Sequence, residues 1–233
     1  IEVYANDSSG NVQTNNVFFY VSTPFNSPIL SDFPSKMYAC ESTSNFSYEF
    51  NATDLNEDPL QFSLTPSNPF YVSPSDWTEG GEEVVEANLI STSLMKSHVG
   101  IHNLTVQVTD GGLSDSKATS VEVIGINNPP SVANIGTKTV WTHGDNSTFA
   151  YQVRVLDIEE GTEQQGDFTY NLTFFSGTPF FSISETGFMN ISPDESQIGV
   201  YDLRVCVTDN GIDNPHENIS LCGQTGAPLT SCR

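Results

Sequence analysis

The chain has 233 residues, enough for one large domain or two of ordinary size. It carries 29 acidic and 7 basic residues, and a net charge of −22 repels the phosphates of nucleic acids, so we expect no nucleic-acid partner. No run approaches the ~18–20 apolar residues that a membrane-spanning helix needs. The chain begins at Ile1 without a start methionine or a cleavage site, so we expect it to be a segment of a larger precursor.

The first predicted element is a hairpin within residues 1–29. Ile1–Ala5 alternates apolar and polar residues and runs into a turn at Asp7, and Val17–Val21 then returns as a strand. Pro28 follows, and because proline lacks an N–H the pairing ends there. A lone hairpin cannot bury its apolar face. We therefore expect its partner strands to come from upstream in the same polypeptide or from another subunit.

The remaining sequence repeats itself with a period of about 100 residues, a normal domain size. Three segments recur at about that offset: Phe46–Asp54 and Phe149–Asp157, Gly100–Asp110 and Gly199–Asp209, and Pro69–Ser73 and Pro179–Ser184. Their short alternating strands, separated by turns, predict an all-β chain of tandem β-sandwiches. We predict a truncated first repeat at 1–29, a second repeat at 30–130 and a third repeat at 131–233.

Eight Asn-X-Ser/Thr sequons predict N-linked glycans and passage through the secretory pathway to an extracellular location. Asn103 and Asn171 precede strands whose apolar residues alternate inward, so both side chains are expected to face solvent, as a glycan requires. The candidate sites are Asn6, Asn45, Asn51, Asn103, Asn146, Asn171, Asn190 and Asn218.

Four cysteines in a chain rich in sequons predict disulfides rather than a zinc site. Cys206 and Cys222 lie in two apolar stretches separated by a turn-rich segment, Asp209–Pro215. Two strands joined by that turn would place the thiols opposite each other, which predicts a Cys206–Cys222 disulfide. Cys40 and Cys232 have no such local partner.

Three stretches of the sequence resemble parts of cadherin-like domains, particularly those of the dystroglycan type. Phe50–Ser63 is similar to their acidic strand–loop–strand, Leu104–Gly111 to their penultimate strand, and Asn127–Pro130 to their linker between domains. The same set also suits immunoglobulin-like repeats of large surface proteins. The resemblance implies seven-stranded Greek-key sandwiches in tandem, an extracellular site and an adhesive or structural role.

The resemblance also implies calcium, which cadherins hold between domains with oxygen ligands from the linker and from an acidic loop of the next domain. Gly125 and neutral asparagines stand where cadherin linkers have aspartates, so an acidic turn without metal remains the alternative. The residues carried over are Asn127, Asn128, Asp157 and Glu159 at the second junction, and Asp54, Asn56 and Asp58, which face Asn26, at the first.

The sequence shows no catalytic signature, since its four histidines lack metal-ligand spacing and no nucleophile elbow or phosphate loop occurs. We therefore expect a non-enzyme: a structural extracellular glycoprotein forming part of a fibre, appendage or stalk. The alternative is an adhesion ectodomain that binds a protein or carbohydrate, and an accessory domain of a secreted glycosidase is more distant. Head-to-tail self-association into a filament, or contact with neighbouring repeats of the same chain, is the expected partnership.

Overall fold

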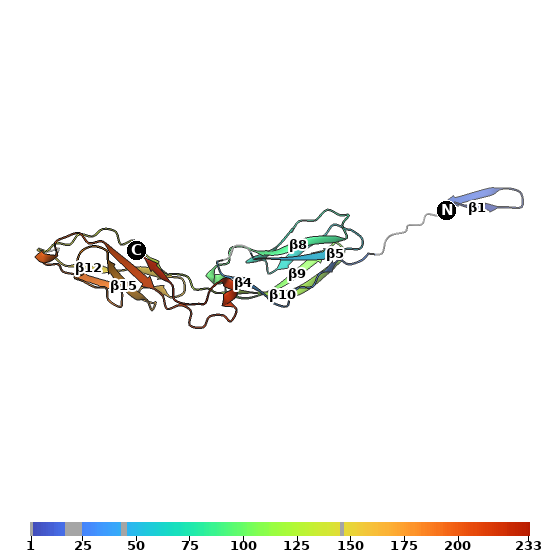
Figure 1. The fold of residues 1–233 in the computed structure, drawn as a ribbon. Coiled ribbons are helices and arrows are strands. Elements are labelled where there is room, and N and C mark those ends of the chain that lie inside the picture. The colour runs from blue at the N-terminus through green and yellow to red at the C-terminus, as the bar shows by residue number, and fades with distance from the viewer. Residues whose placement is uncertain (1, 17–24, 43–45, 145–146) are drawn as a thin grey trace.

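The computed structural model describes residues 2–16, 25–42, 46–144 and 147–233. Figure 1 shows two β-sandwiches arranged end to end, which confirms the predicted all-β fold class. The helical segments in the described ranges are three short 3-10 turns: η1 (Lys96–His98), η2 (Glu195–Gln197) and η3 (Ile219–Cys222). No helix in those ranges is long and apolar enough to cross a membrane.

The second repeat is a sandwich of two four-stranded sheets. One sheet has the order β3-β5-β8-β7 and the other β4-β10-β9-β6, with β4 and β10 parallel and the other neighbours antiparallel. The strands are β3 (Ile29–Leu30), β4 (Met37–Cys40), β5 (Ser47–Thr53), β6 (Gln61–Thr65), β7 (Phe70–Ser73), β8 (Val84–Ser91), β9 (Gly100–Thr109) and β10 (Ser114–Ile124).

The alternation seen in the sequence places the core of this repeat between its two sheets. Leu104, Val106 and Val108 on β9 are all buried, while the residues between them face outward. From the facing sheet, Phe50 meets Phe62 with ring centroids 5.6 Å apart. Each such buried side chain contributes about 2–3 kcal/mol relative to exposure. Alternating apolar residues are therefore what fixes which face of each strand turns inward.

The third repeat uses shorter strands in three smaller sheets, with orders β11-β13-β14, β12-β16 and β15-β17-β18. Its core contains Val153, Val155, Phe168, Met189 and Val207. The strands are β11 (Ser131–Val132), β12 (Phe149–Gln152), β13 (Val155–Asp157), β14 (Gly161–Thr162), β15 (Thr169–Phe174), β16 (Phe188–Ile191), β17 (Leu203–Thr208) and β18 (Thr230–Cys232).

The segments that we predicted as equivalents occupy equivalent places in the two repeats. β9 lies between β6 and β10, and β17 lies between β15 and β18. β5 pairs with β3 and β8, whereas its counterpart is divided into β12, which pairs with β16, and β13, which pairs with β11. The domain boundaries after residues 29 and 130 stay predictions; β3 already begins at Ile29.

The N-terminal hairpin pairs β1 (Glu2–Asn6) with β2 (Val12–Asn16) in antiparallel register. Its turn forms because one carboxylate oxygen of Asp7 accepts N–H bonds from Ser9 and Asn11, and because Gly10 adopts a φ of +83°. The return strand therefore begins at Val12, close to the turn. The predicted return strand at residues 17–21 lies outside the described residues.

The two repeats differ most in one connection. The second repeat joins β9 to β10 through a tight turn, in which Asp110 accepts N–H bonds from Gly112 and Leu113. The third repeat joins β17 to β18 through a long segment, Asp209–Leu229, here called the strap. The strap carries η3, which lies beside β4 of the second repeat (Figure 1).

Candidate functional site at the junction between the repeats

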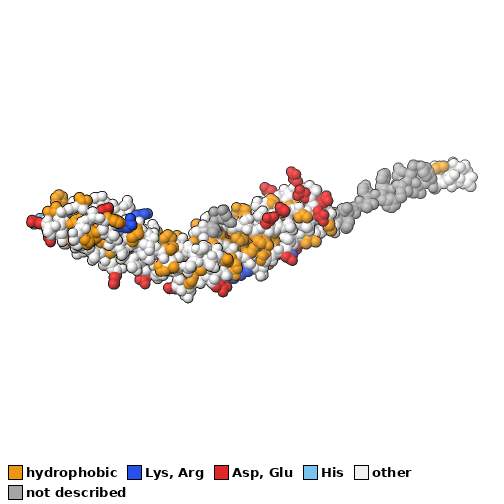
Figure 2. All heavy atoms as spheres, viewed as in Figure 1, with side chains coloured by type: hydrophobic (Ala, Val, Ile, Leu, Met, Phe, Trp, Pro, Cys, Tyr) orange, Lys and Arg blue, Asp and Glu red, His pale blue; other side chains and the backbone are white. Residues whose placement is uncertain are grey.

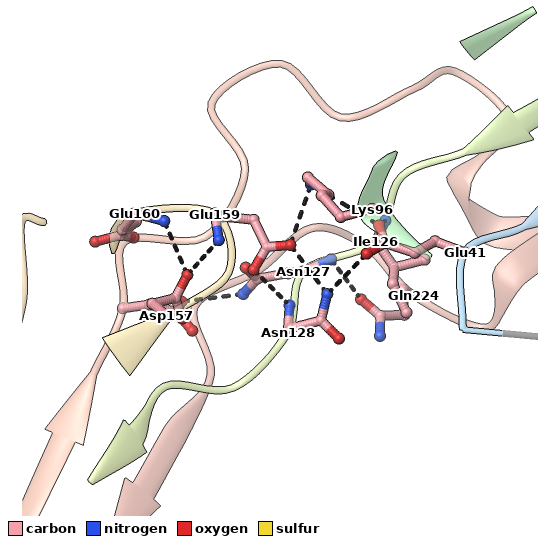
Figure 3. A network of polar contacts seen from close by, with 10 residues as sticks. Glu41, Lys96, Ile126, Asn127, Asn128, Asp157, Glu159, Glu160 and Gln224 are labelled. Atoms are coloured by element: carbon pink, nitrogen blue, oxygen red, sulfur yellow. Dashed lines mark hydrogen bonds and ion pairs between the residues drawn. The ribbon is translucent and has the colours of Figure 1, made fainter. Parts of the chain in front are cut away.

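The linker from β10 to β11 enters the junction through Asn128, which joins carboxylates from both repeats (Figure 3). Its backbone N–H donates to Glu159 Oε2 at 3.2 Å, and its side-chain Nδ2 donates to Glu159 Oε1 at 2.9 Å. The same Nδ2 donates to Glu41 Oε1 at 3.3 Å. The structure thus brings together Asn128 and Glu159, as the sequence led us to expect, and adds Glu41 from the second repeat.

A lysine of the second repeat completes this contact. Lys96, in η1, places its Nζ 3.1 Å from Glu159 Oε1 and 3.8 Å from Glu41 Oε2. The side chains of Glu41 and Glu159 are only 2% and 10% exposed, so a single ammonium serves two largely desolvated carboxylates. Glu41 also accepts the N–H of Ile126 at 3.1 Å. Sequence reasoning missed Lys96 and Glu41; the one available signal was that the chain has so few basic residues.

Asp157 organises the acidic loop of the third repeat from within. One of its oxygens accepts the N–H groups of Glu159 and Glu160 at 2.7 and 2.9 Å, which folds the loop after β13. Its other oxygen is buried without a hydrogen-bond partner among the described residues. Burial raises the pKa of Asp157, because desolvation disfavours the charged form.

The corresponding loop of the second repeat has the same design. Asp54 is fully buried, and one of its oxygens accepts the N–H of Asn56 at 2.8 Å and of Asp58 at 3.4 Å. Its other oxygen again has no partner in the described part of the chain. The backbone N–H of Asn26 donates to Asn56 Oδ1 at 2.9 Å. Each linker therefore touches the side chain two residues after a buried aspartate, as the repeat predicts.

The second linker asparagine ties the linker to the strap. Asn127 Nδ2 donates to Asp209 Oδ1 and to the carbonyl of Ala227, both at 3.0 Å. Its backbone N–H donates to Gln224 Oε1 at 3.2 Å. Asp209 is 3% exposed and also accepts the N–H of Leu229. Linker, strap and the end of β17 consequently form one hydrogen-bonded unit.

The charges at the junction are balanced by donors rather than by solvent. Burial acts to raise the pKa of Glu159, but hydrogen bonds from Asn128 and Lys96 outweigh burial and hold that pKa below its ordinary value. Burial raises the pKa of Glu160, and the nearby charges of Asp157 and Asp209 add to that rise. The ionised form is thus stabilised at Glu159 and disfavoured at Asp157 and Glu160.

This arrangement decides how well the predicted calcium ligands suit a metal. Calcium takes six to eight oxygens. At the junction, however, Asn127 and Asn128 present amide N–H groups to carboxylates, and Lys96 holds Glu159, so this half of the set does not fit calcium. Among the described residues, no three His, Cys, Asp or Glu side chains form a group that could hold a metal. The other half of the set, Asp54, Asn56 and Asp58, includes the Asp54 oxygen that has no hydrogen-bond partner among the described residues.

The predicted Cys206–Cys222 disulfide is wrong. The structure pairs Cys206 with Cys232, whose Cα atoms lie 4.0 Å apart, and Cys40 with Cys222, whose Cα atoms lie 5.6 Å apart. Cys206 and Cys232 stand directly opposite in the β17–β18 ladder. The prediction failed because the segment after Asp209 is the strap rather than a tight hairpin turn.

Contacts along the strap bring Cys222 to the second repeat. His216 lies against β4 and β10, with its ring centroid 6.0 Å from that of Tyr38 and its Nε2 3.2 Å from Glu122 Oε2. Ile219 in η3 is buried, and Gln224 meets the linker. The Cys40–Cys222 disulfide therefore sits between contacts on either side of it.

The sequon asparagines lie mostly on the surface. Asn103 and Asn171 face outward, as their strand alternation predicted, and their glycosylation stays a prediction. Asn45 and Asn146 lie outside the described residues, Asn218 is half-buried, and the exposed positions are Asn6, Asn51, Asn103, Asn171 and Asn190.

Some solved structures are similar to this chain at low sequence identity and with TM-scores below 0.5. The human protocadherin-24 EC1-2 structure (form II) is 18% identical, with 89% of this chain and 94% of that chain covered and a TM-score of 0.49. Drosophila N-cadherin EC1-4 is 14% identical, with 89% and 48% covered and a TM-score of 0.48. The titin domains z1z2 in complex with telethonin are 14% identical, with 90% and 95% covered and a TM-score of 0.36.

No protein-family model matches the sequence, and no curated protein matches it either. The fold is a tandem arrangement of two β-sandwiches.

Replacing Lys96 tests the junction. We expect Lys96→Met to lower the free energy of unfolding by about 2 kcal/mol at pH 7, because two desolvated carboxylates lose their cation. The lowered pKa of Glu159 makes its contribution present above the ordinary carboxylate pKa and lost as pH falls through the lowered value. The deficit should therefore shrink as the pH falls from 7 to below the ordinary glutamate pKa of about 4.3. Urea denaturation at pH values across this range measures the deficit.

Lys117→Met is the matched control, since Lys117 pairs with Asp32, whose side chain is 93% exposed. An exposed pair contributes little to stability, because water screens its charges. A Lys96→Met deficit that is no larger than that of Lys117→Met, or that does not change with pH, would contradict the assigned role of Lys96.

Proposed function

We propose that this chain belongs to an extracellular structural glycoprotein, built of tandem β-sandwich repeats, that serves in a fibre, appendage or stalk and is not an enzyme. The observation that carries the proposal is the covalent bond between the repeats, which is the disulfide that joins Cys40 to Cys222. Beside it, Lys96 contacts both Glu41 and Glu159. A fixed angle between repeats is what an extended support requires. Two disulfides also favour an oxidising, extracellular location.

The chemistry at the junction supports a structural role over catalysis. The carboxylates there accept hydrogen bonds from backbone N–H groups and asparagine amides, as Asp157 does from Glu159 and Glu160. These hydrogen bonds hold the side chains in place rather than presenting them to a substrate. Their shifted pKa values therefore accompany an inter-repeat contact, which is the other common origin of perturbed ionisation.

An adhesion ectodomain is the second candidate, and exposed apolar side chains favour it. Ile198 and Val200 are 74% and 91% exposed, and the repeat places them in equivalence with Val99 and Ile101, which are 41% and 58% exposed. Apolar residues that remain outside at the same place in two repeats are a feature of protein-binding surfaces. Such a surface suits a partner protein or the contact between neighbouring copies.

N-linked glycans belong to the proposal. We expect the intact mass of the secreted protein to fall after enzymatic removal of N-glycans, because five sequon asparagines are exposed. Asn103→Gln should remove the mass of one glycan. Asn88→Gln, which alters an asparagine of β8 outside any sequon, should remove none. An intact protein whose mass is unchanged by the enzyme would refute the glycans.

Calcium is proposed only for the Asp54 loop. Acidic side chains gather on the second repeat (Figure 2), and four glutamates line a shallow groove there: Glu79, Glu82, Glu83 and Glu86. This groove adjoins the loop, since the N–H of Asp54 donates to the carbonyl of Glu83 at 2.8 Å. Fixed negative charge raises the local concentration of cations.

Calorimetry with calcium chloride at millimolar concentration tests this site. We expect binding that is lost in Asp58→Asn, which removes a charged ligand, and retained in Glu159→Gln at the junction, where Lys96 takes the place of a metal. Absence of binding in the unaltered chain, or loss in Glu159→Gln alone, would contradict the assignment.

Assembly tests the structural role itself. We expect the purified protein to form filaments that electron microscopy detects at high concentration, and a chain that lacks residues 1–24 to remain monomeric. The physical reason is that a two-stranded hairpin such as β1–β2 is marginal without further strands, which a neighbouring copy can supply. A protein that stays monomeric, with no filament in native material, would favour the adhesion alternative.

A further inference from the structure

The disulfides determine which parts of the chain bear tension that is applied at its two ends. Cys40 ends β4 near the start of the second repeat, whereas Cys222 lies in the strap of the third. The disulfide between them spans a sequence separation of 182 residues. Apart from Leu30, Met37 and Ala39, the buried core residues of both repeats lie within that interval. Tension that enters before Cys40 can leave after Cys222 without passing through the chain between them.

We propose that the Cys40–Cys222 disulfide makes the two repeats a load-bearing unit whose cores are shielded from tension along the chain. This rests on the proposed function, since a fibre, appendage or stalk is where such tension arises. Pulling on the two ends loads only the residues before Cys40, the disulfide and the residues after Cys222. Residues 41–221 form a closed loop beside this path.

The segment before Cys40 is suited to carry load. β3 pairs with β5 at Thr53, the end of β5 that leads into the Asp54 loop. β4 ends with Cys40 opposite Ile124, which leads into the linker at the junction. The segment from β3 to Cys40 therefore already runs along the length of the second repeat, so tension can lengthen it only slightly.

On the other side of the junction, the path leaves through β18. Cys222 leads to Cys232, which is opposite Cys206 in the ladder and bonded to it. This second disulfide has a sequence separation of 26 residues, so it fixes the exit strand to the third repeat without lengthening the path. Loss of the second disulfide leaves the shielding intact, whereas loss of the first ends it.

The placement of Cys222 is supported by contacts on both sides. His216 holds the strap against Tyr38 and Glu122 of the second repeat, and Gln224 accepts the N–H of Asn127. Next to Cys40, the carboxylate of Glu41 pairs with the ammonium of Lys96 and accepts a hydrogen bond from Asn128 Nδ2. The disulfide thus closes where non-covalent contacts already join the two repeats.

Single-molecule force extension tests the proposal on the whole chain, with handles attached at its two ends. We expect the oxidised protein to release only the short segments outside the loop. Reduction of both disulfides in the same folded molecule should then release a further ~630 Å, since each freed residue adds about 3.5 Å.

Two double variants separate the disulfides. Cys206→Ser with Cys232→Ser should resist extension like the unaltered protein. Cys40→Ser with Cys222→Ser should extend by about 540 Å more without any reductant, because only the small loop stays closed. Equal extension of the oxidised and reduced unaltered protein would overturn the proposal, and that comparison holds even where a variant does not fold.

The measurement concerns one chain and does not depend on assembly. A protein that forms no filaments but resists extension would contradict the proposed fibre and leave the shielding standing. A protein that forms filaments but whose oxidised chains extend by several hundred Å would support the proposed fibre and contradict the shielding.

Discussion

Three carboxylates are almost fully buried where the second and third repeats meet, and the arrangement of the junction depends on how they are satisfied. Glu41, Asp157 and Asp209 are each at most 3% exposed. A buried charge without a partner costs several kcal/mol, so each must receive donors from its surroundings. The chain has only 7 basic residues, which leaves most of this task to backbone N–H groups and asparagine amides.

The donors come from segments far apart in the sequence, and this is why satisfying the charges also assembles the junction. Asn128 from the linker and Lys96 from η1 converge on Glu159, whereas Asn127 reaches Asp209 at the start of the strap. Once linker and strap are joined, η3 is held beside β4. Cys40 and Cys222 are bonded at the same place, with Cα atoms 5.6 Å apart, so the covalent link and the polar contacts join the same two repeats.

The fold was predictable where one residue type governs local geometry. Alternating apolar residues at Leu104, Val106 and Val108 specify a strand and its inward face, and the recurrence of that pattern at Val205 and Val207 specifies a second sandwich. The proximity of Asn128 and Glu159 was expected from the resemblance to cadherin-like domains, which assigned both residues to one junction. These features need no knowledge of distant segments.

The disulfides and the lysine were not predictable, because each depends on contacts between segments remote in sequence. A turn-rich stretch after Asp209 has the same composition whether it closes a hairpin or extends as a strap, so the pairing of Cys222 could not be read from it. Lys96 carries no motif; its role appears only when η1 lies opposite Glu159. For Asp209 the sequence did hold a signal, because the internal repeat aligns it with Asp110, which follows the equivalent strand of the second repeat.

An internal cation and a free ion would give such a junction different properties. A free calcium ion dissociates when its concentration falls, and the carboxylates it held then repel one another. Lys96 is part of the chain, so its ammonium remains available at any salt composition, and the disulfide holds the repeats together even where high salt weakens the ion pairs. With a net charge of −22, two copies of the chain repel each other through solvent. The contact between the repeats is thus made by a disulfide and by buried polar groups, whereas the surface charge acts between molecules.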